Sequence, residues 1–161
     1  MTGAQDRFRL SATPFDVAAR RAALLDARVG AYASFEGWVR DHNAGRSVDA
    51  LRYEAYERLA LAEGARILDE ALERFDVIDV ACVHRVGDVA IGELAVWVGA
   101  TAAHRDPAFA ACRYVIDAVK ARVPIWKHER YGDGDAGWLH PQGAPGPGTV
   151  PGGQQGGGPA D

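Results

Sequence analysis

Residues 104–130 read HRDPAFAACRYVIDAVKARVPIWKHER, a stretch that predicts a helix followed directly by a strand. Asp106 is a good N-cap, and Pro107 suits the first helical position because its missing N–H is not needed there. The helix is expected to run to about Val123, since Pro124 cannot continue it. A strand is expected to follow directly, over residues 125–130.

The strand predicted at residues 125–130 sorts its side chains by face. Successive residues of a strand point to opposite sides, so Lys127 and Glu129 share one face. Trp126 and His128 then lie on the other face.

Elsewhere in the chain the order of elements is mixed. Residues 31–40 alternate apolar and polar side chains, which is typical of a half-buried strand, here ending at Arg40. Apolar residues spaced three and four apart predict a helix over residues 61–75. Further strands are expected at residues 8–11, 51–56, 77–86 and 92–101, a helix at 16–25 and a loop at 41–47. This order favours an α+β fold with a mixed or antiparallel sheet and packed helices over a regular βαβ repeat.

The composition bounds the class of protein. A chain of 161 residues with 48% apolar and 25% charged content fits one domain, expected over residues 1–140. A net charge of -4 and a pI near 5.7 argue against a general nucleic-acid binder. No signal segment and no run of about 18 apolar residues are present in the sequence, so neither export nor a membrane span is expected. Cys82 and Cys112 are interpreted as buried free thiols in a cytoplasmic protein.

Residues 141–161 have a different composition from the rest of the chain. Thirteen of these twenty-one residues are Gly or Pro and only one is charged, so the segment cannot bury a core. We expect a disordered Gly/Pro-rich tail that takes no part in the site.

The two lysines are a compositional oddity. Sixteen of the eighteen basic residues are Arg, and the remaining two are Lys120 and Lys127. Only a lysine can lose its proton and serve as a nucleophile or base, so such a chain is expected to keep lysine where an amine is required. Chance remains the alternative. Both side chains would in any case serve as ligands for an anion.

Two other stretches suit an anion. His104 and Arg105 directly precede the helix, whose free backbone N–H groups and dipole favour a bound phosphate. Arg40 opens a stretch up to Gly45 that is either an anion-binding loop or a plain turn. The stretch HRVG at residues 84–87 is interpreted as structural.

Taken together, these stretches resemble the large, catalytic subunit of molybdopterin synthase. The resemblance covers about residues 8–140 and rests on several separate blocks in a fixed order. The blocks are FEGWVR (35–40), HNAG (42–45), LRYEAY (51–56), HRVG (84–87), AHR (103–105) and KARVPIWKHE (120–129).

The resemblance implies an α/β hammerhead-type fold and a sulfur-transfer reaction. Two sulfurs would enter cyclic pyranopterin monophosphate and form the dithiolene of molybdopterin, in molybdenum cofactor biosynthesis. The donor would be a small ubiquitin-like sulfur-carrier subunit with a thiocarboxylated Gly-Gly C-terminus. Two of each subunit would form a heterotetramer around a homodimer of the catalytic subunit. No cofactor and no metal is expected, because molybdenum would enter the product later.

Matched by position, the resemblance also implies roles for the basic residues. Lys120 would lie beside the incoming glycine tail, and Lys127 would contact the substrate or transfer protons. Arg40, His104 and Arg105 would hold the phosphate and the pterin.

Four further residues are expected around this pocket. Phe35, Ile116 and Glu129 would line or support it, and His128 would bind substrate. Ile116 and His128 stand where other members carry another apolar and another basic side chain, respectively.

The length of the 106–123 helix raises a geometric question. Arg105 and Lys120 bracket about fifteen helical residues, which separates them by more than about 20 Å. One small substrate does not easily bridge that distance. We therefore hypothesise that His104 and Arg105 of one chain complete the lysine pocket of a dimer mate.

Three other functions compete with this reading of the sequence. The chain could be a non-catalytic docking subunit for a ubiquitin-like sulfur carrier, in which case Lys120 would not be needed for sulfur transfer. It could be an unrelated enzyme that forms a Schiff base on a lysine. It could also bind RNA through Trp38, Trp97 and Trp126, although stacking platforms of that kind normally lie in a basic groove.

Overall fold

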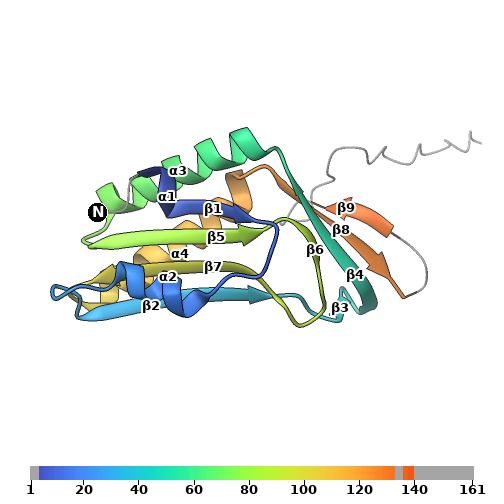
Figure 1. Cartoon of the computed structure of the whole chain (residues 1–161), viewed down its shortest axis with the longest axis horizontal. Coiled ribbons are helices and arrows are strands. Elements are labelled where there is room, and N and C mark those ends of the chain that lie inside the picture. Colours follow the sequence, from blue (N-terminus) through green and yellow to red (C-terminus); the bar gives the residue numbers. More distant parts are fainter. Residues whose placement is uncertain (1–3, 133–135, 140–161) are drawn as a thin grey trace, which may run out of the picture.

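A computed structural model describes residues 4–132 and 136–139, which form two β-sheets and four helices. The first sheet has the strand order β1-β5-β7-β2 (Figure 1). These strands are β1 (Phe8–Ser11), β5 (Asp79–Arg85), β7 (Leu94–Ala102) and β2 (Ala31–Trp38). Strand β1 is parallel to β5, and the other neighbours are antiparallel. The α+β class and the mixed sheet predicted from the sequence are confirmed.

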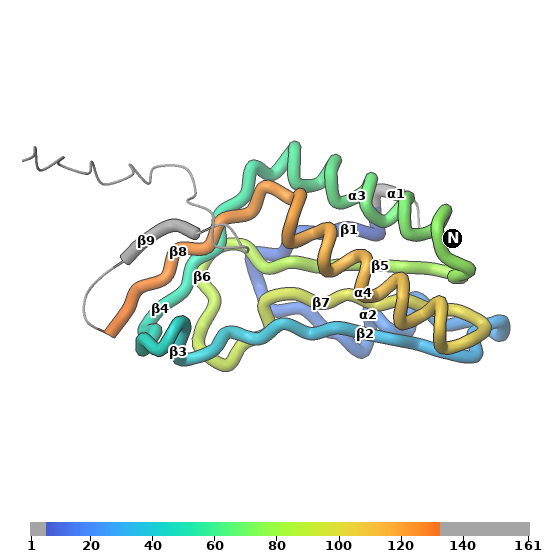
Figure 2. The backbone as a smooth tube through the Cα atoms, turned by 180° about the vertical axis from the view of Figure 1, so that it is seen from behind, coloured from blue at the N-terminus to red at the C-terminus, as the bar shows by residue number. Residues whose placement is uncertain are grey.

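Helices cover both faces of this sheet. The long helices α3 (Glu57–Arg74) and α4 (Arg105–Arg122) pack side by side on one face, as Figure 2 shows from behind. Helix α2 (Val17–Leu24) lies on the opposite face, and the short helix α1 (Ala4–Arg7) precedes β1. Strand β7 is therefore buried almost throughout, which explains its nearly continuous apolar sequence.

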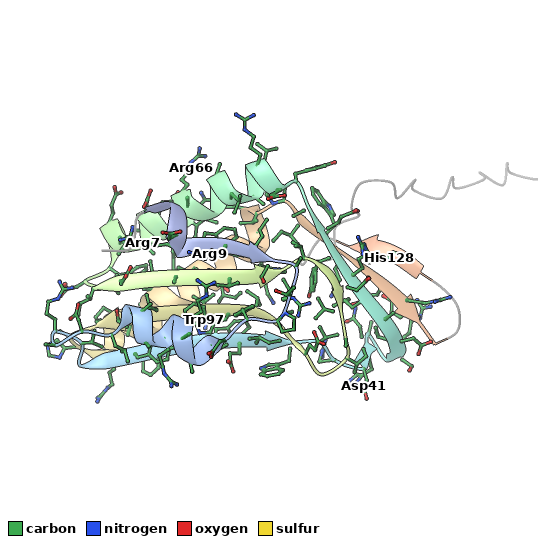
Figure 3. All side chains as sticks on the ribbon, viewed as in Figure 1. Arg7, Arg9, Asp41, Arg66, Trp97 and His128 are labelled. Atoms are coloured by element: carbon green, nitrogen blue, oxygen red, sulfur yellow. The ribbon has the colours of Figure 1, made fainter. Side chains whose placement is uncertain are left out.

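The smaller core under α2 is organised by one tryptophan. Trp97 on β7, labelled in Figure 3, is fully buried and packs with Leu24 and Val83. Its indole N–H donates to the hydroxyl of Tyr32 at 3.1 Å, so the polar atom of the ring is satisfied. The sequence-based alternative that uses this residue to stack on RNA is wrong, because the ring has no exposed surface.

The second sheet extends from the end of the first. It has the order β3-β4-β8-β9, and β6 (Gly87–Val89) also pairs with β4. The other strands are β3 (His42–Asn43), β4 (Arg46–Ala55), β8 (Ile125–Tyr131) and β9 (Ala136–Leu139). The sequence predicted β8 but missed the short strands β3, β6 and β9.

The predicted loop at residues 41–47 is in fact a tight β-hairpin. His42 pairs with Ser47 and Asn43 with Arg46, which leaves a two-residue turn. Both turn residues have positive φ, 49° at Ala44 and 76° at Gly45, as the turns that match the twist of a hairpin require. The loop prediction was wrong because β3 has only two residues, both polar, and the first residues of β4 are mostly polar too.

Helix α4 begins earlier than the sequence suggested. His104 is its N-cap and Arg105 its first residue, so Asp106 and Pro107 lie in the first turn. The prediction of Asp106 as N-cap was wrong because an acidic side chain and a proline are equally compatible with that turn. The helix ends at Arg122, before Pro124, as predicted.

Helix α4 is fixed to α3 near its C-terminus by an ionic network. Arg122 is 2.6 Å from both Glu63 and Glu70, and the Tyr114 hydroxyl donates to Glu70 at 2.6 Å. Hydrogen bonds from Arg122 and Tyr114 lower the pKa of Glu70 to about 2. The network therefore holds the last turn of α4, which carries Lys120, against its neighbour.

Two further predictions from the sequence concern the cysteines and the C-terminal tail. Cys82 and Cys112 are free and buried, as predicted. The expected disordered tail at residues 141–161 lies outside the described residues, so the tail stays a prediction.

Helix α3 approaches β1 so closely that only glycine fits at position 64. A Cβ added to Gly64 would overlap the ring of the buried Phe8. We expect Gly64→Ala to lower the free energy of unfolding by about 2 kcal/mol, because overpacking outweighs the better helix propensity of alanine. Denaturant titration measures the effect.

Two further variants separate the causes of that loss. Ala62→Gly, at an exposed position of the same helix, measures the propensity contribution alone, about 1 kcal/mol. Adding Phe8→Leu to Gly64→Ala should recover part of the loss through the shorter side chain. Full stability of Gly64→Ala would contradict this account of the contact.

Candidate functional site

A pocket of about 170 Å³ opens where the two sheets meet. Its walls come from the end of β2, from β4, β5, β7 and β8, and from the last turns of α4. The polar side chains on these walls are Arg40, Tyr53, His84, Lys120 and Lys127. The lysine pair and the arginine after β2 are far apart in the sequence, but they border the same pocket.

A smaller hollow of about 60 Å³ adjoins this pocket. Trp38, Arg40, Tyr53 and Lys127 line both spaces, so the two form one site. We call the combined space the lysine pocket. The smaller hollow adds the side chain of Glu129, among others, to its walls.

Lys127 is held in place by a buried carboxylate. Its Nζ lies 2.9 Å from Oε1 of Glu129, whose side chain is only 4% exposed. The Nδ2 of Asn43 donates to both carboxylate oxygens, at 2.9 Å and 3.2 Å. Asn43 belongs to the β3–β4 hairpin, so this hairpin helps to position the Glu129 carboxylate in the pocket.

Glu129 remains charged despite its burial. Burial alone would raise its pKa, but hydrogen bonds from Tyr131, Asn43 and Lys127 together leave the pKa lower than usual. The carboxylate is therefore ionised at neutral pH and keeps its partner Lys127 oriented. One negative charge thus lies among Arg40, Lys120 and Lys127, which leaves the pocket with an excess of positive charge.

Lys120 occupies a different environment on the last turns of α4. Its Nζ lies 5.8 Å from the centroid of the Phe35 ring, within the range of a cation–π contact. The side chain is exposed at the rim, and Ile116, one turn earlier, is buried in the pocket wall. Lys120 is thus accessible from outside, whereas Lys127 is fixed inside.

His84 and Tyr53 form the uncharged part of the pocket. The His84 Nδ1 donates to the backbone carbonyl of Arg85 at 2.7 Å, and the Tyr53 ring stands edge-on at 4.9 Å. Burial and the nearby Lys120 lower the pKa of His84 to about 4. The ring is therefore neutral at pH 7, and its Nε2 is a hydrogen-bond acceptor. Burial likewise raises the pKa of Tyr53 to about 12.

Three residues expected at the site lie elsewhere in this chain. His104 and Arg105 are exposed at the start of α4, and Figure 2 shows that this helix runs from there to the junction with β8. A rise of about 1.5 Å per residue puts Arg105 about 22 Å from Lys120. His128 projects from β8 in the second sheet (Figure 3) and lines neither space.

The site thus agrees only in part with the sequence-based expectation. The structure brings together Arg40, Ile116, Lys120, Lys127 and Glu129, with Phe35 against Lys120. Sequence reasoning did not assign Trp38, Tyr53 or His84 to the pocket. Their only signal was membership of the blocks at 35–40, 51–56 and 84–87 that carry the family resemblance, since strand pairing decides which of those residues meet.

In residues 4–132 and 136–139, no group of three or more His, Cys, Asp and Glu side chains could hold a metal ion. None of the helices in the same ranges is long and apolar enough to cross a membrane.

The fold and the site define an α+β chain with a cationic pocket suited to a small anionic substrate. Comparison with known families makes this specific: residues 10–122 match the family model described as MoaE protein. The chain therefore belongs to the MoaE protein family. The molybdopterin synthase catalytic subunit of Synechococcus elongatus is 40% identical over 140 residues, covering 86% of this chain and 85% of that protein. The protein of the same name from Pyrococcus abyssi is 41% identical, with coverages of 75% and 82%.

Solved structures agree with this assignment. The chain matches molybdopterin synthase from Staphylococcus aureus with a TM-score of 0.75 and 32% identity, covering 84% of this chain and 96% of that one. It matches the molybdopterin biosynthesis MoaE protein of Burkholderia ambifaria with a TM-score of 0.70 and 38% identity, covering 81% and 86%. The resemblance to the catalytic subunit of molybdopterin synthase is thereby confirmed, and with it a role in molybdenum cofactor biosynthesis.

The buried His84 predicts how stability depends on pH. Its pKa is about 4 in the folded chain and 6.5 when unfolded, so between these values only the unfolded chain takes up the proton. Stability should therefore fall as the pH drops from about 6.5 to 4, by about 3 kcal/mol at most, and this contribution should level off below that range. Denaturant titrations at several pH values measure it.

His84→Asn is the matched control, because the asparagine amide can still donate to the carbonyl of Arg85 but does not titrate. The variant should lose this part of the pH dependence. An unchanged slope would mean that other groups cause it.

Proposed function

We propose that the chain is a sulfurtransferase acting on cyclic pyranopterin monophosphate. Sulfur would come from the thiocarboxylated Gly-Gly C-terminus of a small ubiquitin-like subunit, in two transfers that form the dithiolene of molybdopterin. The observation that carries the proposal is the convergence of Arg40, Lys120 and Lys127 on one pocket. A phosphate ester requires such cations, and sulfur transfer requires a group that can give or take protons.

The two lysines have different proposed roles because their surroundings differ. Lys127, fixed by Glu129 inside the pocket, contacts the substrate or transfers protons to it. Lys120, exposed at the rim beside Phe35, meets the incoming glycine tail. Arg40 holds the phosphate together with donors from the second copy described below. We place these functions in one catalytic domain, residues 1–140, acting in the cytoplasm.

The substrate site would be completed by a second copy of the chain. His104 and Arg105 lie at the opposite end of α4 from Lys120, too far away to share one small substrate within a chain. In a two-fold dimer the start of α4 of one copy can approach the lysine pocket of the other. Two small subunits would then make the heterotetramer, one at each pocket.

The first test of the proposal is reconstitution. The wild-type chain, mixed with a thiocarboxylated small subunit and cyclic pyranopterin monophosphate, should give dithiolene product. Lys120→Ala and Lys127→Ala should each lower the rate by at least about a hundredfold, because the first loses the contact with the glycine tail and the second loses a cation or proton donor at the substrate. Quantification of the product under single-turnover conditions provides the measurement.

Arg113→Ala is the matched control for the loss of one positive charge on α4, since Arg113 is exposed and borders neither part of the lysine pocket. It should leave the rate unchanged. Sulfur transfer at the full rate by Lys120→Ala with the partner bound would instead favour the non-catalytic docking subunit.

Hybrid dimers test the shared pocket. His104→Ala and Lys120→Ala homodimers should both be inactive, but a hybrid holds one pocket with both residues intact. Random mixing makes half of the dimers hybrids with one working pocket each, so activity should recover to about a quarter of the wild-type value. Absence of recovery, with hybrids verified by native mass spectrometry, would place His104 outside the partner's pocket.

A further inference from the structure

Trp38 is an exposed aromatic residue at the edge of the lysine pocket. It is the last residue of β2, and the pairing with β7 shifts register between Gly37 and Trp38. Its side chain is 56% exposed, whereas Trp97, on the neighbouring strand, is fully buried. A tryptophan of this exposure keeps much of its large apolar ring in water, which is unfavourable unless something covers the ring.

The position of Trp38 indicates what could cover it. The residue lines both parts of the lysine pocket, together with Arg40, Tyr53 and Lys127. Among the described residues, no aromatic ring stacks on it and no cation lies over it. An indole that lines the same space as two cations suits a ligand that is both flat and anionic.

Two parts of such a ligand would be recognised by different side chains, the anionic group by the cations and the flat ring by Trp38. Arg40 and Lys127 attract the anionic group, because each presents a cation to the same space as Trp38. Stacking on an aromatic side chain recognises a flat heterocycle through its face and needs no directional hydrogen bond. The geometry favours a small ligand over a protein surface, since this side chain borders both the concave space of about 170 Å³ and the hollow of about 60 Å³ beside it.

We propose that Trp38 is the stacking platform for the heteroaromatic ring of the substrate and a determinant of its specificity. The proposal rests on the proposed function, which supplies a pterin as the flat anionic ligand. Trp38 acts by binding and takes no part in proton transfer. Its loss therefore weakens substrate binding without slowing the chemical steps.

Steady-state kinetics of the complex with the thiocarboxylated small subunit test this role. Trp38→Ala should raise KM for the cyclic pterin about tenfold and leave kcat within about twofold. Trp38→Phe should restore most of the affinity, whereas Trp38→Leu, which is apolar but not aromatic, should resemble alanine. Leu59→Ala is the matched control, because Leu59 is 63% exposed on α3 and borders neither part of the pocket.

A binding titration keeps this proposal separate from the proposed function. Tryptophan fluorescence of the wild-type chain should be quenched by a pterin phosphate, and Trp38→Phe should remove most of that quenching even where no product is formed. An unchanged KM and quenching in Trp38→Ala would overturn the proposal. A rise in KM for the small subunit alone, or a loss of dimers, would also overturn it by assigning Trp38 to a protein interface.

Discussion

The lysine pocket depends on the two-residue connection between α4 and β8. Only Val123 and Pro124 separate the helix from the strand, and Val123 and Ile125 are buried. The N–H of Val123 donates to Val119 at 3.1 Å, and the N–H of Tyr56 donates to Pro124 at 3.2 Å. The turn is therefore anchored to both the helix and the start of α3. Because the connection is short and anchored at both ends, Lys120 before it and Lys127 after it border the same space.

Within that space a single buried carboxylate gives the two lysines different surroundings. Charges removed from water are costly unless paired, and Glu129 meets this requirement with hydrogen bonds from Asn43 and Lys127. The same pairing restricts Lys127 to one orientation. Lys120 lacks such a partner in the described part of the chain and contacts only the face of Phe35 as a cation. The pocket therefore combines a preorganised cation with one that can follow an incoming group.

The sequence predicted the elements well and the site only in part, for a physical reason. Periodicity and Pro124 are local signals, so α4, β8 and the facing of Lys127 and Glu129 were found correctly. Helix length is also set by local signals, so the distance between Arg105 and Lys120 could be predicted from the sequence. Which strands meet is decided by long-range pairing, so Tyr53 on β4 could not be assigned to the pocket. The N-cap of α4 was misassigned because Asp106 and Pro107 are compatible with several positions in the first turn.

The charge distribution identifies the same site without any reference to relatives. Several arginines in the described ranges are paired with carboxylates: Arg7 pairs with Asp79, Arg85 with Glu93 and Arg122 with Glu63 and Glu70. Arg40 and Lys120 border a pocket, yet no described carboxylate pairs with either. A chain with a net charge of -4 has ample acidic residues to supply such partners. An anionic ligand needs cations that are not already paired with carboxylates of the protein, because such pairing would cancel the attraction that binds the ligand. The unpaired Arg40 and Lys120 at this concave surface meet that need.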